Sequence, residues 1–315
     1  MSPATAILIG TMLGCVFGCS VSTDPSVQMG TAEFHIADAP SDDESVRSVF
    51  VTVTDVRVEG SPIPDFVPLT IDLAALKEGK TQVLGTSTFI ATAFKTVTLV
   101  INTNVDAAGQ TPGAYVQTFD DAKYKLKDGG TMEITIEKRW SVPPNAKVSV
   151  VVDVDLRKAI KESADPAVRY AFVSDANLGS AFRITTKEES STISGTYAEQ
   201  VASGADKVIV YAYKNGTFDL TTESQPQTED AIFFRNAVTS AAVPNTGSVN
   251  FYSLFFIEPG DYQLFFAAYK RDAASGKLLF QGVLKSTTVF QAAASDYITV
   301  QAGIPAMVAT TITGI

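Results

Sequence analysis

The residues that could carry chemistry are few and lie near the start of the chain. The sequence contains two cysteines, Cys15 and Cys19, and a single histidine, His35. Nucleophile–base catalysis usually relies on histidine or cysteine, and zinc sites need several such ligands. His35 stands in the run EFHIA, where we expect an exposed strand residue rather than a catalyst. The sequence therefore excludes a zinc site and predicts a protein that is not an enzyme and needs no cofactor, with calcium as the one open alternative.

The densest group of carboxylates lies in the turn DAPSDDE, which contains Asp38, Asp42, Asp43 and Glu44. Hard cations such as Ca²⁺ prefer several oxygen ligands, so this turn is a candidate calcium site. Its spacing does not match an EF-hand loop, and Pro40 sets the bend of the turn. A solvated acidic turn is the favoured interpretation, and calcium binding at these four residues is the alternative.

Both cysteines follow a glycine in an apolar run from about Ala4 to Gly18, which is shorter than the roughly 20 residues needed to span a bilayer. The run resembles the signal peptide of bacterial lipoproteins, in which a cysteine after a small residue is lipidated. Cys19 is favoured over Cys15, because it leaves a longer apolar segment before it and no free thiol after it. The resemblance implies a signal peptide over residues 1–18 and a polar tether over residues 19–29. An ordinary signal peptide with incidental cysteines is the alternative.

Composition narrows the class of partner. The chain has 315 residues, a formal net charge of −10 and 45% hydrophobic residues, so it can bury substantial cores. An acidic surface repels phosphate backbones, so we expect no nucleic-acid partner. The membrane is expected to be a partner through the N-terminal lipid.

Most of the chain shows the alternation of apolar and polar residues that is typical of β-strands. In the run VFVTVTDVRVEG, Val49, Val51 and Val53 define one face, and Val56 and Val58 continue that apolar face beyond Asp55. Similar runs recur to the end of the chain and are separated by glycine and proline turns. The best candidate for a short helix is the segment from residue 155 to residue 163.

A polar connector, ITTKEESSTISG, separates two series of strand-like runs, and we place a domain boundary near Glu188. The predicted fold class is mainly β, with two tandem antiparallel β-sandwich domains over residues 30–187 and 188–315. One or two short helices are expected in the first domain.

Two resemblances cover the two predicted domains. The segment EFHIADAPSDDESVRSVFVTVTDVRV, with VVDVDLRKAI and AFRI further on, resembles the domain-of-unknown-function 4382 family of bacterial lipoproteins over roughly residues 30–187. The remainder, with ISGTY, VIVYAY and LFFIEPGDYQLFFAAY, is similar to the carboxypeptidase-regulatory, transthyretin-like β-sandwich, although Ile257 and Glu258 depart from its simpler leucine pattern. These resemblances imply a lipid-anchored envelope protein, most commonly of the outer membrane, and they supply no reaction.

Aromatic residues gather in the second predicted domain. They are Phe251, Tyr252, Phe255, Phe256, Tyr262, Phe265, Phe266 and Tyr269. We expect one set in the core and another packed against the first domain, because neighbours along a strand point to opposite faces. A glycan-stacking or partner-binding surface is the alternative.

These observations favour a non-enzymatic, lipid-anchored protein that acts as a binding, adhesive or structural module at the cell envelope, with a protein or a glycan as partner. The alternative is a secreted glycan-acting enzyme or its accessory carbohydrate-binding subunit, because the carboxylate pair of a glycosidase is not recognisable from spacing alone.

Overall fold

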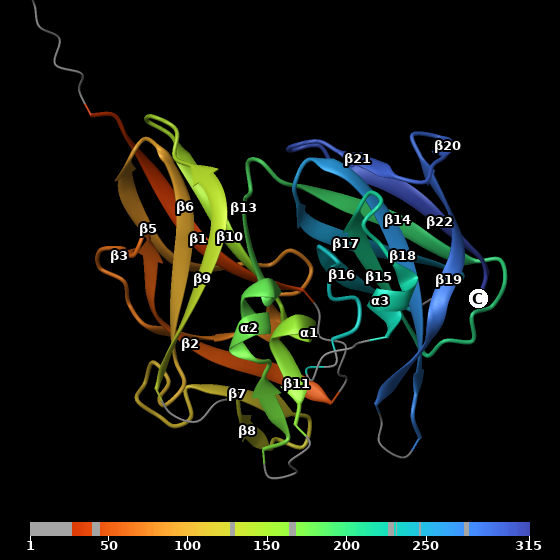
Figure 1. Ribbon diagram of the computed structural model, residues 1–315, viewed down its shortest axis with the longest axis horizontal. Coiled ribbons are helices and arrows are strands. Elements are labelled where there is room, and N and C mark those ends of the chain that lie inside the picture. The colour runs from red at the N-terminus through yellow and green to blue at the C-terminus, as the bar shows by residue number, and fades with distance from the viewer. Residues whose placement is uncertain are drawn as a thin grey trace, which may run out of the picture.

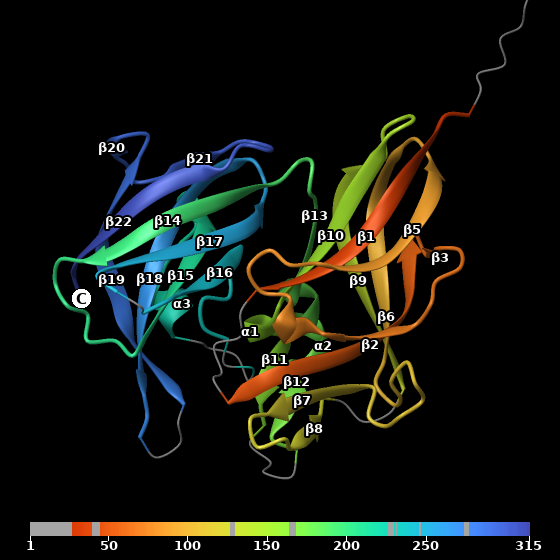
Figure 2. The same cartoon turned by 180° about the vertical axis from the view of Figure 1, so that it is seen from behind.

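The computed structural model describes residues 27–39, 45–126, 130–163, 168–225, 230, 232–245, 247–273 and 277–315. Its strands form two groups that lie side by side (Figure 1), and Figure 2 shows the same arrangement from behind. We call residues 29–186 the N-terminal unit and residues 191–314 the C-terminal unit. The prediction of a mainly β fold with few, short helices is confirmed.

Two facing sheets build most of the N-terminal unit. The first contains β1 (Met29–Ala39), β5 (Gln82–Ile90), β10 (Lys147–Asp155) and β13 (Phe182–Thr186), in the order β13-β10-β1-β5. The second contains β2 (Val46–Val58), β3 (Ser61–Pro62), β4 (Leu69–Asp72), β6 (Ala93–Asn102), β7 (Ala114–Thr118), β8 (Lys123–Lys125) and β9 (Thr131–Ser141). Its order is β8-β7-β2-β6-β9, and β3 and β4 also pair with β2.

Apolar side chains from both sheets meet in one core. Phe34 of β1 and Trp140 of β9 are buried there and contact edge to face, with ring centroids 5.8 Å apart. The change of alternation in β2 has a structural cause, because its pairing with β6 shifts register between Val53 and Asp55. This bulge returns Val56 and Val58 to the core face, so the predicted continuation of the apolar face is confirmed.

Short elements complete the N-terminal unit. They are the helices α1 (Leu156–Ala159) and α2 (Asp175–Leu178), the 3₁₀ turns η1 (Leu73–Ala75) and η2 (Gly179–Ala181), and a small sheet of β11 (Ile160–Glu162) and β12 (Tyr170–Phe172). The expected helix over residues 155–163 is therefore shorter than predicted. It ends at Ala159 because the next three residues pair with β12, so long-range strand pairing overrides local helix propensity there.

The strands of the C-terminal unit form one sheet that folds back on itself. It contains β14 (Ser191–Glu199), β15 (Lys207–Lys214), β16 (Thr239–Val243), β17 (Val249–Ile257), β18 (Gly260–Arg271), β19 (Leu278–Phe290), β20 (Ala293–Ala294), β21 (Ile298–Val300) and β22 (Ala306–Gly314). The strand order is β16-β15-β18-β19-β22-β14-β17, with β20 and β21 paired to β19 and β18, and the short helix α3 (Leu220–Ser224) lies between β15 and β16 in the chain.

The long strand β19 joins the two layers of this unit. Its first half, up to Leu284, pairs with β18, and its second half, from Lys285, pairs with β22. The sheet therefore folds over at this point and encloses a core. Within that core, the ring of Phe266 contacts those of Tyr197 and Tyr252 at centroid distances of 5.5 and 5.6 Å.

Most strand pairs are antiparallel, as predicted, but β1 pairs with β10 and β14 pairs with β22 in parallel. The first of these parallel pairs carries the carboxylates described below. In the described parts of the chain, no helix combines the length and the apolar character needed to cross a bilayer.

Candidate functional site

The structure describes one of the four residues of the predicted calcium site. Asp38 lies near the end of β1 and is buried, with 6% of its surface exposed. Asp42, Asp43 and Glu44 lie outside the described residues, as do Cys15 and Cys19. Within the described ranges, no three histidine, cysteine or acidic side chains are arranged to hold a metal ion. Calcium binding in this turn therefore stays a prediction, whereas the burial of Asp38 shows that this residue is not part of a solvated surface.

Asp38 is a buried carboxyl group without a hydrogen-bond partner of ordinary geometry. Neither of its side-chain oxygens has such a partner among the described residues. Burial raises the pKa of Asp38 well above its usual value, and the nearby carboxylates of Asp153 and Asp155 raise it further. The backbone N–H of Leu156 and the ammonium group of Lys77 lower this pKa, but by less. A buried acid in this state is costly for the fold.

The two neighbouring carboxylates differ from Asp38 because each has a cationic partner. Asp153 forms an ion pair with Arg183, and the Nη2···Oδ2 distance is 2.6 Å. Asp155 pairs with Arg157 at 2.6 Å and with Lys158 at 3.4 Å. The pKa of Asp153 is nevertheless raised, because its burial outweighs the opposing effect of Arg183. Of this group, Asp38 alone is left without an ion pair in the described part of the chain.

The same cations reach across to the C-terminal unit. Arg183 donates hydrogen bonds to the carbonyl oxygens of Phe255 and Phe256 in β17. Arg157 donates to the carbonyl oxygens of Phe233 and Phe234. Each guanidinium group therefore holds a buried carboxylate of β10 on one side and the backbone of the other unit on the other side. This double engagement sets the position of the two units relative to each other.

A cleft of about 480 Å³ lies where these elements meet. The N-terminal unit contributes Asp38, Lys77, Glu78, Gly79 and Asp153, and the C-terminal unit contributes Lys207, Thr239, Ser240, Ala241, Ala242, Pro244, Phe251, Tyr252, Ser253, Phe255 and Phe256. The hydroxyl group of Ser240, like the Asp38 carboxyl group, is buried and has no hydrogen-bond partner among the described residues. Two unsatisfied polar groups thus line one cleft. The volume of this cleft is typical of ligand sites.

One wall of the cleft is a row of alternate residues in β17. Phe251, Ser253 and Phe255 occupy successive outward positions, while Tyr252 and Leu254 between them are buried in the core. The Phe255 ring packs over Gly79, so closely that a Cβ atom there would lie 2.6 Å from it. Phe251 stands further out and is 70% exposed. The expected division of the aromatic residues between the core and the inter-unit surface is therefore observed along β17.

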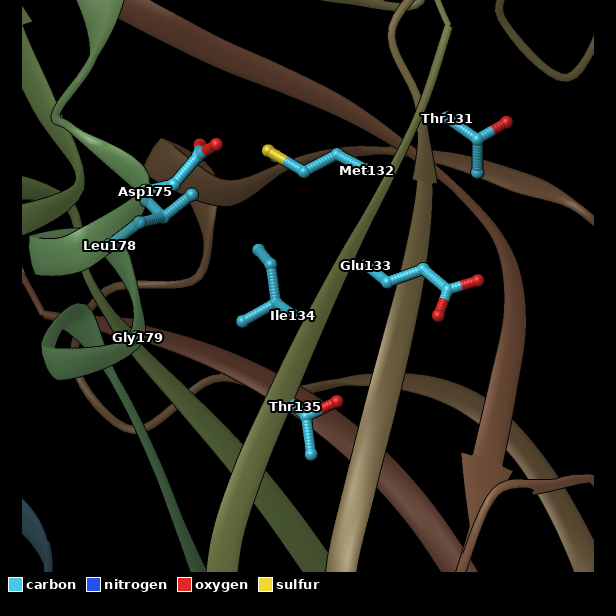
Figure 3. Close-up of a pocket in the computed structure, with 8 residues that line it drawn as sticks. All are labelled: Thr131, Met132, Glu133, Ile134, Thr135, Asp175, Leu178 and Gly179. Carbon is cyan, nitrogen blue, oxygen red and sulfur yellow. The ribbon is translucent and has the colours of Figure 1, made fainter.

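A second groove runs beside β9, and Figure 3 shows its lining. The side chains of Met132 and Ile134 point from β9 towards α2, whereas that of Glu133 points to the opposite side (Figure 3). This groove measures about 350 Å³. None of the buried, unpartnered side-chain atoms found in the described residues lies in its lining. The inter-unit cleft is therefore the stronger candidate site.

His35 corrects one expectation. The sequence predicted an exposed strand residue, but His35 is buried, with 5% of its surface exposed. Its ring hydrogen-bonds to Glu33 and Thr81. Burial and the nearby Lys187 lower the pKa of His35, so the ring is neutral at pH 7. It lies outside the lining of the cleft.

Sequence reasoning missed Asp153 and Ser240. A signal for Asp153 was present, because VVVDVDL places two acidic residues inside an otherwise apolar run, and buried aspartates almost always have a partner or a role. No comparable signal marks Ser240, since serine is common in strands that face solvent.

Comparisons with solved structures find only distant likeness. BcpA, the major pilin subunit of Bacillus cereus, is 9% identical, with a TM-score of 0.21 over 91% of this chain and 71% of that one. The major pilin T-13 of Streptococcus pyogenes is 10% identical, with a TM-score of 0.20 over 92% of this chain and 98% of that one.

A leucine-rich repeat protein of Bacteroides thetaiotaomicron is 10% identical, with a TM-score of 0.23 over 91% of this chain. This chain spans 26% of that protein's length. At such TM-scores these likenesses carry no functional argument.

No curated protein matches the chain. A family model does match, over residues 29–173, which include every strand from β1 to β12. The match ends before β13, although β13 completes the first sheet of the N-terminal unit. The transthyretin-like resemblance of the remainder stays a prediction. Residues 29–173 thus match the model of the family described as Domain of unknown function (DUF4382).

Proposed function

We propose that this chain is a lipid-anchored protein of the bacterial cell envelope that acts as a non-enzymatic binding module, with the inter-unit cleft as its ligand site. The observation that carries the proposal is the pair of buried, unpartnered groups, Asp38 and Ser240, that line this one cleft. Native proteins satisfy nearly all buried polar groups. Seven of the described residues have a buried side-chain atom without a hydrogen-bond partner, and two of them, Asp38 and Ser240, line this cleft, where one ligand could hydrogen-bond to both.

The anchoring part of the proposal rests on the sequence. Cys19 follows Gly18 at the end of the apolar run, and a polar segment separates it from β1, which begins at Met29. The lipid on Cys19 would hold the two units at the membrane, and the outer membrane is the proposed location. The non-enzymatic part is supported by His35, which is hydrogen-bonded to its neighbours away from the cleft.

A glycan-acting enzyme is the second candidate, because two carboxyl groups with raised pKa, Asp38 and Asp153, line the same cleft. Glycosidases use such a pair as acid and base or nucleophile. The ion pair between Asp153 and Arg183, which also holds the backbone of β17, supports a structural role for Asp153 instead.

The test combines attachment and turnover. Cells expressing the full chain are separated into membrane and soluble fractions, and the mature N-terminus is identified by mass spectrometry. We expect a diacylated or triacylated Cys19, release or retention of the uncleaved precursor in Cys19→Ser, and little change in Cys15→Ser. An unmodified N-terminus elsewhere overturns the anchoring. Hydrolysis of any glycan by the purified chain, lost in Asp38→Asn, overturns the non-enzymatic assignment.

A further inference from the structure

We propose that the inter-unit cleft binds a sugar residue of a glycan, with Phe251 as the stacking platform and Asp38 and Ser240 as the polar contacts. This inference rests on the proposed binding function and names the chemistry of its ligand. It starts from the groups that the fold leaves unsatisfied. The Asp38 carboxyl group and the Ser240 hydroxyl group need hydrogen-bond partners, and both are buried in the lining of the cleft. Sugar hydroxyls suit both groups, because each hydroxyl can donate and accept.

The charges of the cleft favour a neutral, hydroxyl-rich ligand. Asp38, Asp153 and Glu78 are acidic, whereas Lys77 and Lys207 are basic, so neither sign dominates the lining. A strongly cationic ligand would meet the two lysines, and a strongly anionic one would meet the three carboxyl groups. A ligand with many uncharged donors and acceptors avoids both kinds of repulsion.

The hydroxyl side chains of the C-terminal wall extend this pattern. Ser240 comes from β16 and Ser253 from β17, so the polar contacts come from both strands. The Ser253 hydroxyl already bonds to that of Ser194 at 3.0 Å, which orients it, while the Ser240 hydroxyl is the one without a partner among the described residues.

Phe251 supplies the apolar part of the site. Its ring is 70% exposed, although it belongs to the same outward row as Phe255, which is packed over Gly79. A pyranose ring has a C–H face that packs on an aromatic ring while its hydroxyls reach sideways to polar groups. Burial of the Phe251 ring would remove a large apolar surface from water.

The cleft is also pre-organised, because the two units are fixed by buried polar contacts rather than by a loose hinge. Arg183 bonds to Asp153 of the N-terminal unit and to two backbone carbonyls of β17, the strand that carries Phe251. The positions of Asp38 and Phe251 are therefore set before a ligand arrives, which reduces the entropy lost on binding.

The experiment screens the purified full chain on a glycan array and then titrates the best oligosaccharide by calorimetry. The titrations compare wild type with Phe251→Ala, Ser240→Ala and Asp38→Asn. Phe119→Ala, which removes another exposed phenylalanine (67% exposed) outside the cleft, is the matched control. We expect Phe251→Ala to raise the Kd about tenfold or more, and Asp38→Asn to raise it roughly 3- to 10-fold, the effect of one weakened hydrogen bond. Phe119→Ala should leave the Kd unchanged.

Two results overturn the inference. One is a glycan whose Kd is the same in wild type and in Phe251→Ala, because that glycan binds elsewhere. The other is an array without binding, together with synthetic peptides of mixed sequence that bind wild type and are lost in Phe251→Ala, because the cleft then serves a peptide. In the second case the proposed binding function stands while the sugar inference fails. The proposed function itself fails separately, through the N-terminus or through glycan hydrolysis.

Discussion

Lys161 of β11 and Asp230 of the C-terminal unit form an ion pair across the two units, and the Asp230 side chain is fully enclosed while the Lys161 side chain is 28% exposed. Asp230 also accepts hydrogen bonds from the hydroxyl group of Ser174 and the side-chain amide of Asn177. One carboxylate of the C-terminal unit therefore gathers three groups of the N-terminal unit, from β11 and from the start of α2. This cluster and the arginine contacts described above join the units through polar groups.

The first prediction concerns the free energy of unfolding. Asp230→Ala leaves Lys161, Ser174 and Asn177 without their common acceptor. We expect a loss of about 1–3 kcal/mol, since the hydrogen bonds of an enclosed charge are removed. The measurement is denaturant unfolding followed by circular dichroism. The control is Asp121→Asn, which removes the charge of the exposed partner of Arg47, tolerates the positive φ of this position and should change stability by less than about 1 kcal/mol. Equal losses in the two variants would show that the hydrogen bonds of Asp230 stabilise the fold no more than an exposed ion pair does.

The second prediction gives the pH dependence of that cluster. Hydrogen bonds from Asn177, Lys161 and Ser174 lower the pKa of Asp230 far below its usual value, even though burial acts in the opposite direction. The folded pKa lies below the unfolded value of about 3.9, so the stabilisation is present above about pH 4 and is lost as the pH falls towards the folded pKa. The stability difference between wild type and Asp230→Ala should therefore shrink below about pH 4. A difference that is constant from pH 7 to pH 3 contradicts this assignment.

The third prediction has the opposite sign and concerns Asp38. Its pKa is raised, chiefly by burial and then by Asp153 and Asp155, so the folded state binds its proton more tightly than the unfolded state does. Wild type should lose stability as the pH rises from about 4 through the raised pKa, and Asp38→Asn should remove this loss. We expect the variant to melt at a higher temperature than wild type at pH 7 and to lose this advantage near pH 3. Asp65→Asn, at an exposed position, is the control and should show neither effect. A variant that melts lower than wild type at pH 7 contradicts the prediction.

The fourth prediction tests the contact between Gly79 and Phe255. Gly79 has a φ of +74°, and an added Cβ atom would lie 2.6 Å from the Phe255 ring. Gly60 has a similar φ of +78° but no atom within 4 Å of the same position. Gly60→Ala should therefore cost about 1 kcal/mol from backbone strain alone, and Gly79→Ala roughly 2–4 kcal/mol from strain plus the clash. Denaturant unfolding of both variants measures the difference. Equal costs would mean that the Phe255 ring moves away freely.

Comparison of the sequence with the structure separates local from long-range information. The alternation in β2 correctly assigned Val49, Val51 and Val53 to one buried face, because a strand's side chains alternate whatever its partner is. The mainly β class followed from the repetition of such runs. The helix over residues 155–163 was predicted too long, since pairing of β11 with β12 lies outside any local pattern. Likewise, His35 was expected to be exposed because its strand context did not reveal Thr81 and Lys187, which come from distant parts of the chain.

The domain boundary near Glu188 stays a prediction. The connector at this boundary makes more hydrogen bonds to the rest of the protein than its polar sequence indicates. The Glu188 carboxylate accepts a hydrogen bond from the backbone N–H of Ser149, and the carbonyl oxygen of Ser190 accepts one from the N–H of Gly303. Ser190 and Ser191 are buried. Polar composition alone does not show whether water or the protein satisfies a segment's backbone groups.

The candidate site shows the same division most clearly. The local pattern of residues was enough to identify a mainly β protein and to single out Asp38 as a residue that could carry chemistry. The folded chain was needed to show that Asp38 is buried beside Asp153 through the parallel pairing of β1 with β10, and that Ser240 and Phe251 line the same cleft. This division arises because alternation specifies which face of a strand is apolar, whereas the partner of that strand is chosen by packing and hydrogen bonding over the whole chain.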